Sequence, residues 1–478
     1  MKKHYLIIDI GTGNSRVSLV SSMGEIYAIK TIENIYYMDS HHEDAQYFSP
    51  SFWKRRILGI CKEIIHENPT IKIDAISSSG ARETIVLLDK EGNEFFGLPN
   101  IDNRAREYMK DICDIDYIYE KTGRWVSEDF PAAKLYGLKK GRNDIFKRVH
   151  SFTSLSEWMA YILTGNLVIE PSQACETQLY DITTKDWSTT LCDLYQMRHL
   201  ELPKLVNGGV NIGSIRDDIK KDLKIDYDID FIIGGADTQL AAIGAGIKEG
   251  GVGIISGTTS PVVALKTDLF YDEEKRCWVD CFVGGKQYQV ETNPGVTGLN
   301  YQRIRNLLFP EVSYDDIEEG FKEVTDIKCT AFFSSLDFTN GKGYETGGFI
   351  MRPPFHFDMH RIDLAWAVVG DIACSIYTQY LHLLDLLQLH PKEVVGCGGG
   401  FQSSTLCQHI ADLTGKKLCL PKNYQQSSIL GCIALCNQAY SIEVEVTSDD
   451  YIIYEPRKES LIIKYYEIWK ENRKKLDS

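Results

Sequence analysis

The sequence lacks several patterns that would place the protein in a familiar class. No two cysteines are separated by two residues, and no histidine cluster accompanies any of them, so a zinc site is not expected. The 13 cysteines are scattered, as is typical of small buried side chains in a reduced, cytoplasmic protein. The apolar run after Lys3 is interrupted by Asp9, and no later run is long enough to cross a membrane. We therefore expect neither a signal peptide nor a membrane-spanning segment.

The sequence also has fewer basic than acidic residues. The chain has 67 acidic and 52 basic residues, which gives a formal net charge of −15. This balance argues against nucleic acid or an anionic membrane surface as a partner, although it permits a small local site for phosphate. Hydrophobic content of 43% and a length of 478 residues predict a globular protein with two large domains.

No Walker motif is present, because the glycine-rich segment near the N-terminus has no Gly-Lys-Ser/Thr that enters a helix. Instead, residues 5–10 are predicted to form a buried strand and residues 16–20 a returning strand, with the turn at Gly11, Thr12, Gly13 and Asn14. Glycines let the backbone of such a turn approach an anion, and Thr12 and Asn14 add side-chain donors. The sequence therefore predicts a phosphate-binding hairpin.

The same pattern recurs about 246 residues later. Residues 253–265 again contain a strand, a turn with Gly257, Thr258 and Thr259, and a second strand. A duplicated hairpin at this separation indicates two related domains that face each other, although one short match can also arise by chance. We place the two domains at residues 1–246 and 247–478.

Asp237 occupies a glycine-bordered turn between a predicted strand at 231–233 and a helix rich in small residues. This is an N-cap position, and a carboxylate there can accept a proton from a substrate hydroxyl. The alternative is that Asp237 only caps the helix.

Gly398, Gly399 and Gly400 lie between a predicted strand at 393–397 and a helix at 404–413. Three glycines in that position let a nucleotide lie flat against the backbone and the start of the helix. The alternative is a tight turn without a ligand.

Arg82 and Glu83 lie in a predicted polar loop, residues 78–84, between strands at 73–77 and 85–88. A guanidinium beside a carboxylate offers donors and acceptors for vicinal hydroxyls, whereas the alternative is an inconsequential surface ion pair. Residues 100–104 are predicted to open a helix. Further helices are expected at 50–67, 158–163, 361–388 and 457–475.

Several of these segments, in this order, resemble motifs of the FGGY carbohydrate kinases. The chain is similar to that family at residues 9–16, 130–135, 234–239, 255–260, 297–302 and 396–400. The resemblance implies an α/β fold of two ribonuclease-H-like domains, of the actin and hexokinase type, around a central nucleotide cleft. It implies that ATP and Mg²⁺ are the cofactors and that a small sugar or polyol is the substrate.

The resemblance also implies roles for individual residues. Asp237 would be the catalytic base, and Asp9 and Asp237 would hold Mg²⁺ through water. The acceptor would contact Arg82, Glu83, Asp102, Glu157, Asp237 and Gln239. The nucleotide would contact Asp9, Gly11, Thr12, Gly13, Asn14, Gly257, Thr258, Thr259, Gly298, Gln302, Gly398, Gly399, Gly400 and Ser403. For Asp102, an ion pair with Arg104 is the alternative.

Within the family, residues 82–92, 100–105, 156–165 and 171–174 are most similar to the autoinducer-2 kinases. This likeness favours a short linear polyol or ketose as the acceptor, and the alternatives are a glycerol kinase or a pentulose kinase. Two other classes stay open, an actin-like ATPase and a sugar-binding regulator without activity. The sequence leaves the oligomeric state open, and a homodimer is compatible with it.

Overall fold

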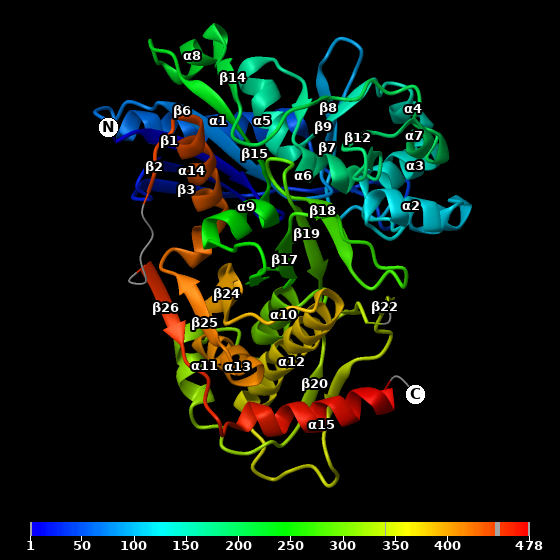
Figure 1. The fold of residues 1–478 in the computed structure, drawn as a ribbon, viewed down its shortest axis with the longest axis vertical. Helices are drawn as coiled ribbons and strands as arrows, with labels where there is room; N and C mark the ends of the chain where they lie inside the picture. Colours follow the sequence, from blue (N-terminus) through cyan, green and yellow to red (C-terminus); the bar gives the residue numbers. More distant parts are fainter. Residues whose placement is uncertain (1, 340, 445–449, 477–478) are drawn as a thin grey trace.

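The computed structural model describes residues 2–339, 341–444 and 450–476. Figure 1 shows two layered α/β halves, one above the other, with the N-terminal half at the top. Each half contains one large sheet, and a pair of helices lies between the two sheets. No helix in the described part of the chain is long and apolar enough to cross a membrane.

The first sheet has six strands. The antiparallel hairpin predicted around residues 11–14 is present, and the apolar side chains of its first strand are buried. A third strand extends this hairpin, and two further strands run parallel to the first on its other side. In sheet order the strands are β14 (Asn211–Ser214), β15 (Asp230–Ala236), β6 (Ala75–Gly80), β1 (His4–Ile10), β2 (Asn14–Ser21) and β3 (Ile26–Glu33).

The second sheet repeats this topology. Its first two strands form the predicted second hairpin, a third strand extends the hairpin, and two parallel strands follow on the other side. In sheet order the strands are β18 (Trp278–Cys281), β19 (Tyr288–Thr292), β17 (Val262–Lys266), β16 (Val252–Ile255), β24 (Glu393–Cys397), β25 (Lys417–Pro421) and β26 (Tyr451–Tyr454). The duplication inferred from two short turns is therefore confirmed by five strands in each sheet.

Helices α9 (Asp237–Ala245) and α14 (Ser427–Ala439) pack against each other between the sheets (Figure 1). Their backbones approach closely, because a Cβ atom on Gly244 would lie 2.0 Å from the Ser427 oxygen. Small residues at such a crossing let two helices touch along their main chains. Since α14 also packs on β1 of the first sheet, the chain returns to its N-terminal half near its end. The division after residue 246 stays a prediction.

The remaining elements cover the sheets or form insertions. The long helix predicted at 361–388 is confirmed as α12 (Arg361–Leu387), and it packs beside α15 (Leu461–Leu476). A three-stranded sheet is inserted after β6. The helices are α1 (Pro50–Glu67), α2 (Ile115–Thr122), α3 (Pro131–Gly141), α4 (Asn143–Phe146), α5 (Leu155–Thr164), α6 (Pro171–Ala174), α7 (Thr189–Leu194), α8 (Asp217–Leu223), α10 (Gly298–Leu308), α11 (Tyr314–Phe321), α12 (Arg361–Leu387), α13 (Ser404–Thr414) and α15 (Leu461–Leu476), and the inserted strands are β7 (Ile85–Leu88), β8 (Glu94–Leu98) and β9 (Ser151–Ser154).

Two local predictions were wrong. Residues 78–80 continue strand β6 instead of opening a loop, because pairing with both β1 and β15 satisfies the backbone of these polar residues. Residues 100–104 form a turn, and the following helix is a short 3-10 helix at Arg106–Asp111. The turn before this helix depends on a residue far away in the sequence, because the N–H of Asn103 donates to the Asp44 oxygen.

Candidate active site

Asp237 lies at the point where β15 ends and α9 begins. It is the first helical residue, and the N-cap is Ala236, so the prediction that Asp237 is the N-cap was wrong by one position. The Asp237 carboxylate instead accepts hydrogen bonds from the N–H of Thr238 at 2.7 Å and from its hydroxyl at 3.2 Å. The side chain is half-buried, and it binds the N–H of the next residue instead of the N–H groups two or three residues on that an N-cap side chain binds.

Other charged groups act on the Asp237 carboxyl from different parts of the chain. Burial raises its pKa to about 6; the positive charge of Arg82 opposes this rise, and the negative charges of Asp9 and Glu83 add to it. Asp9 is the last residue but one of β1, and Arg82 and Glu83 follow β6. Since β1, β6 and β15 are adjacent and parallel, their carboxyl ends bring these four residues together. A carboxyl with a pKa of about 6 is well suited to accept a proton near neutral pH.

Hydrogen bonds within the turn and from two asparagine side chains hold the first glycine-rich turn in place. The N–H of Gly11 donates to the Asn14 oxygen at 3.0 Å, which closes the turn. The side-chain amide of Asn34 donates to the Gly11 oxygen at 2.7 Å, and the Asn100 amide donates to the Thr12 hydroxyl at 2.8 Å. The tip, at Gly13 and Asn14, is exposed.

The second glycine-rich turn lies against two other segments that the sequence assigned to the nucleotide. A Cβ atom on Gly298, the first residue of α10, would lie 2.1 Å from the Gly257 oxygen. The N–H of Gly400 donates to the Ser256 oxygen at 2.9 Å, and a Cβ atom on Gly400 would lie 2.1 Å from the Ser256 hydroxyl oxygen. These approaches require glycine. The turn, the start of α10 and the triple glycine are therefore contiguous.

The other residues predicted to contact the nucleotide differ in whether they already have partners within the protein. Gly399 is exposed, and a Cβ atom placed on it meets no other described atom within 4 Å. Gln302 is exposed on α10. Ser403 is the N-cap of α13, where its hydroxyl accepts from the N–H of Leu406 and donates to Glu318 of α11. Gly399 thus faces open space, whereas Ser403 already has partners within the protein.

The loop that carries Arg82 and Glu83 is fixed by a buried lysine. Glu83 has a φ of 57°, in the left-handed region that non-glycine residues seldom adopt. The Nζ atom of Lys134 donates to the Glu83 backbone oxygen at 2.9 Å, and burial lowers the pKa of Lys134 to about 8. The residues Phe130 to Leu135, which resembled a family signature, thus supply the group that holds the Glu83 backbone.

Arg82 is not a surface residue, which excludes the surface ion pair as its explanation. Only 8% of it is exposed, and its guanidinium binds the Glu291 carboxylate of β19 with Nη1–Oε2 and Nη2–Oε1 distances of 2.8 and 3.3 Å. Glu291 belongs to the second sheet, so this ion pair joins the two halves of the molecule.

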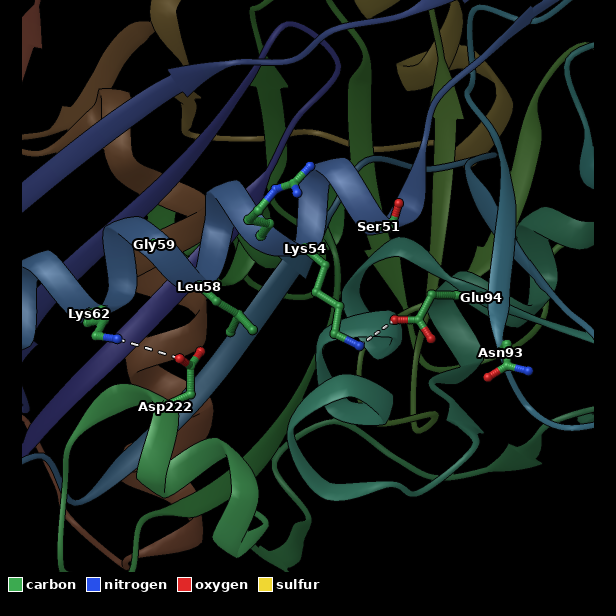
Figure 2. Close-up of a pocket in the computed structure, with 9 residues that line it drawn as sticks. Ser51, Lys54, Leu58, Gly59, Lys62, Asn93, Glu94 and Asp222 are labelled. Atoms are coloured by element: carbon green, nitrogen blue, oxygen red, sulfur yellow. Dashed lines mark hydrogen bonds and ion pairs between the residues drawn. The ribbon is translucent and has the colours of Figure 1, made fainter.

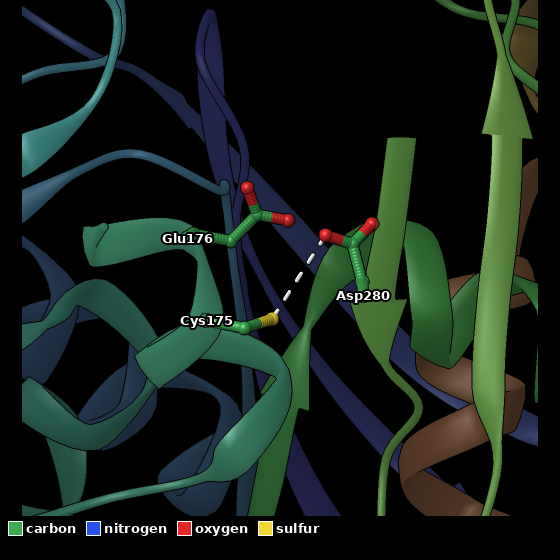
Figure 3. A group of neighbouring side chains, drawn as sticks. All are labelled: Cys175, Glu176 and Asp280. Carbon is green, nitrogen blue, oxygen red and sulfur yellow. Dashed lines mark hydrogen bonds between the residues drawn. The ribbon is translucent and has the colours of Figure 1, made fainter. Parts of the chain in front are cut away.

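A second buried arginine lies beside this pair, and sequence reasoning missed it. The Nε atom of Arg124 donates to Asp280 at 2.7 Å, and its Nη2 donates to Glu176 at 2.6 Å. Figure 3 shows Cys175 and Glu176 on one segment, facing Asp280 on a strand. Three such ligands could hold a metal ion, but the Arg124 guanidinium already binds both carboxylates as the cation. No local pattern signals this cluster, because Arg124 and Asp280 are 156 residues apart.

Three other residues that the sequence assigned to the acceptor are buried. Asp102 is fully buried and binds the Nε atom of Arg104 at 2.6 Å, which is the ion pair that the sequence left as an alternative. Glu157 is buried and accepts from the hydroxyls of Ser154 and Ser156. Gln239 is fully buried, and neither polar atom of its amide has a hydrogen-bond partner among the described residues.

A separate groove of about 540 Å³ lies on the outer face of α1 (Figure 2). Two of its lysines are already paired, Lys54 with Glu94 at 2.7 Å and Lys62 with Asp222 at 3.5 Å. None of the residues assigned above to the phosphate turns or to the region of Asp237 lines this groove. The groove is therefore a surface feature apart from the candidate active site.

Comparison with known families matches this chain twice. Residues 4–244 match the N-terminal domain of the FGGY family of carbohydrate kinases, and residues 346–440 match its C-terminal domain. The chain belongs to the FGGY family. It is therefore a carbohydrate kinase, an enzyme that transfers a phosphoryl group.

Relatives of known sequence agree with this assignment. The chain is 36% identical over 477 residues to "Putative sugar kinase YoaC" of Bacillus subtilis (strain 168), covering 99% of this chain and 97% of that protein. It is 24% identical over 379 residues to the autoinducer-2 kinase of Escherichia coli (strain K12), covering 75% and 71%.

Solved structures show the same fold throughout. The xylulose kinase from Lactobacillus acidophilus superposes with a TM-score of 0.85 at 21% identity, covering 100% of this chain and 99% of that one. The glycerol kinase from Plasmodium falciparum, solved with ADP, has a TM-score of 0.85 at 16% identity, covering 99% and 98%. The predicted α/β fold of two related halves is thus confirmed for this FGGY kinase.

Proposed function

We propose that this FGGY kinase transfers the γ-phosphoryl group of ATP to a hydroxyl of a small sugar, polyol or linear ketose. The observation that supports this most is the arrangement of Asp237. Its carboxyl lies at the carboxyl ends of the parallel strands, and its pKa is raised by burial and shifted by the charges of Arg82 and Asp9. Phosphoryl transfer depends mainly on positioning and on neutralising charge, so a proton acceptor beside a phosphate cradle is the arrangement it needs.

The phosphates of ATP are assigned to the two glycine-rich turns. Backbone N–H groups at Gly11 to Asn14 and at Gly257 to Thr259 would bind them from the two halves of the molecule. Gly298, Gln302 and the triple glycine would hold the nucleoside. This assignment is supported by the open space at Gly399 and by the contact of Gly298 with the second turn.

The acceptor is assigned to the loop after β6 and to the start of α9. Arg82 and Glu83 would bind its hydroxyls, and Asp237 would take the proton from the hydroxyl that attacks. Gln239 is a further contact in this proposal, because its amide lacks partners in the described structure. Asp102 and Glu157 would support the acceptor site without contacting the acceptor, since both carboxyls already have partners within the protein.

We assign a divalent cation to the carboxylates of Asp9 and Asp237, of which Asp9 also binds Arg16. The negative charge of Asp9 raises the pKa of Asp237, and a nearby cation would relieve this effect. In this proposal both residues hold Mg²⁺ through water. When bound, Mg²⁺ supplies positive charge to the transferring phosphoryl group.

A coupled measurement of ADP release tests this function. The panel contains glycerol, D-xylulose, L-ribulose, aldoses and the linear precursor of autoinducer-2, of which the likeness to the autoinducer-2 kinases favours the last. ADP release that depends on an acceptor supports the proposal, and the acceptor with the highest kcat/KM selects among the autoinducer-2, glycerol and pentulose alternatives. ADP release that no acceptor stimulates would favour the actin-like ATPase instead.

We predict that acid affects activity and stability in opposite directions. Burial raises the pKa of Glu157 and of Glu170 to about 7, from an ordinary 4.5. Because the folded state then binds protons more tightly than the unfolded chain, the free energy of unfolding should rise as the pH falls from 8 to about 5.5. Over the same range kcat/KM should fall, as Asp237 becomes protonated around pH 6.

Thermal unfolding and ADP release, both followed at intervals of half a pH unit, check this prediction. The double variant Glu157→Gln and Glu170→Gln should flatten the dependence of Tm on pH, and any remaining kinase activity should still fall around pH 6. A wild-type Tm that rises from pH 5.5 to 8 would contradict the assignment of these pKa values.

A further inference from the structure

The charges around Arg82 are unbalanced. Glu291 binds the guanidinium through two hydrogen bonds, Glu176 lies 3.6 Å from it, and Asp280 and Glu83 each lie 4.0 Å from it. Arg124 is the second guanidinium of the cluster, and it binds Glu176 and Asp280. Four carboxylates thus share two guanidinium groups.

Burial raises the pKa of Glu176 and of Asp280, neighbouring carboxylates add to the rise, and Arg124 and Arg82 oppose it. Glu291 behaves differently: burial favours its neutral form, but Arg82 and Arg124 outweigh burial and hold its pKa below the ordinary value. Its carboxylate also accepts from the Asn293 amide at 3.0 Å. Glu291 is therefore the carboxylate that binds Arg82 directly and whose charged form the two guanidiniums favour.

Two further basic side chains contact residues of this site. Arg16 binds the Asp9 carboxylate, and Lys134 donates to the Glu83 backbone oxygen. A carboxylated acceptor needs an unpaired cation, because a buried charge without a partner is strongly disfavoured. Hydroxyl groups both donate and accept, so a neutral acceptor can bind among ion pairs that are already formed.

We propose that the Arg82–Glu291 pair makes this kinase selective for neutral hydroxylated acceptors against carboxylated ones, with Glu291 as the residue that determines this choice. The proposal rests on the function proposed above and names a property of the same acceptor site. Because Arg82 follows β6 and Glu291 lies in β19, the selectivity depends on both halves of the molecule. Specificity of this kind comes from an unfavourable interaction with the wrong ligand.

The test compares D-xylulose and glycerol with D-gluconate in wild-type enzyme and in Glu291→Gln, by ADP release. The amide keeps the shape of the side chain but removes the carboxylate that binds Arg82 through two hydrogen bonds. Wild-type enzyme should release ADP with a neutral acceptor and not with D-gluconate. In Glu291→Gln, the ratio of kcat/KM for D-gluconate to that for the neutral acceptor should rise by about tenfold or more. Glu94→Gln, which breaks a carboxylate–lysine pair in the outer groove, should leave this ratio unchanged.

The outcomes separate the two proposals. Wild-type turnover of D-gluconate as efficient as that of the neutral acceptors would overturn the selectivity, while the kinase function would stand; this measurement does not require the variant to fold. An unchanged ratio in folded Glu291→Gln would overturn the role of Glu291. No release of ADP with any acceptor in the full panel would contradict the proposed function itself, and the inference with it.

Discussion

Replacing Asp237 with asparagine is expected to lower kcat by about 10²–10⁴-fold, the usual effect of losing a general base. The amide has nearly the same shape and can still accept a hydrogen bond from the N–H of Thr238, so α9 should keep its start. It cannot take a proton from the acceptor hydroxyl. Affinity for ATP should stay nearly unchanged, because the phosphate turns lie in other segments of the chain.

Initial rates of ADP release and calorimetric titration with ATP measure these two effects separately. Asp222→Asn is the matched control, since its carboxylate pairs with Lys62 at 3.5 Å in the outer groove. This control should behave as wild type. Normal turnover in a folded Asp237→Asn enzyme would show that another group accepts the proton.

Replacing Gly399 with valine is expected to raise the KM for ATP by about tenfold or more, which corresponds to about 1.4 kcal/mol of binding free energy. A Cβ atom at this position meets no other described atom within 4 Å, so the protein itself can accommodate the first carbon of the new side chain. The branched group would occupy the space assigned to the nucleotide. Affinity for the acceptor should change little, because Arg82 and Asp237 lie in other segments.

The glycine at position 400 shows why 399 is the better site to test. A Cβ atom on Gly400 would lie 2.1 Å from the Ser256 hydroxyl oxygen, so a substitution there would disturb the protein itself. Gly59→Val on α1 is the control, since its Cβ atom also meets nothing within 4 Å in the described structure. If Gly399→Val binds ATP as wild type does in calorimetry, the triple glycine is only a turn.

The sequence by itself determined the parts of this protein that depend on neighbouring residues. Alternating apolar residues and glycine turns predicted both hairpins, and helical periodicity predicted α12 within one residue of its observed ends. The order of the short motifs indicated the family, which the comparisons confirmed. Such features are readable because strand pairing in a hairpin and the hydrogen bonds of a helix form between residues close in sequence.

Only the tertiary structure decided features that depend on distant segments. Residues 78–80 are polar and suggested a loop, yet they form a strand because β1 and β15 both pair with them. The predicted N-cap, Asp237, is instead the first helical residue, because pairing with β6 extends β15 as far as Ala236.

The environment of Arg82 shows the same limit most clearly. Its partner Glu291 is 209 residues away, and the neighbouring pair of Arg124 and Asp280 spans 156 residues. Nothing near any of these residues in the sequence distinguishes a buried ion pair from an exposed one. The two halves of the molecule must come together before these charges leave water, and their pairing and protonation follow from that burial.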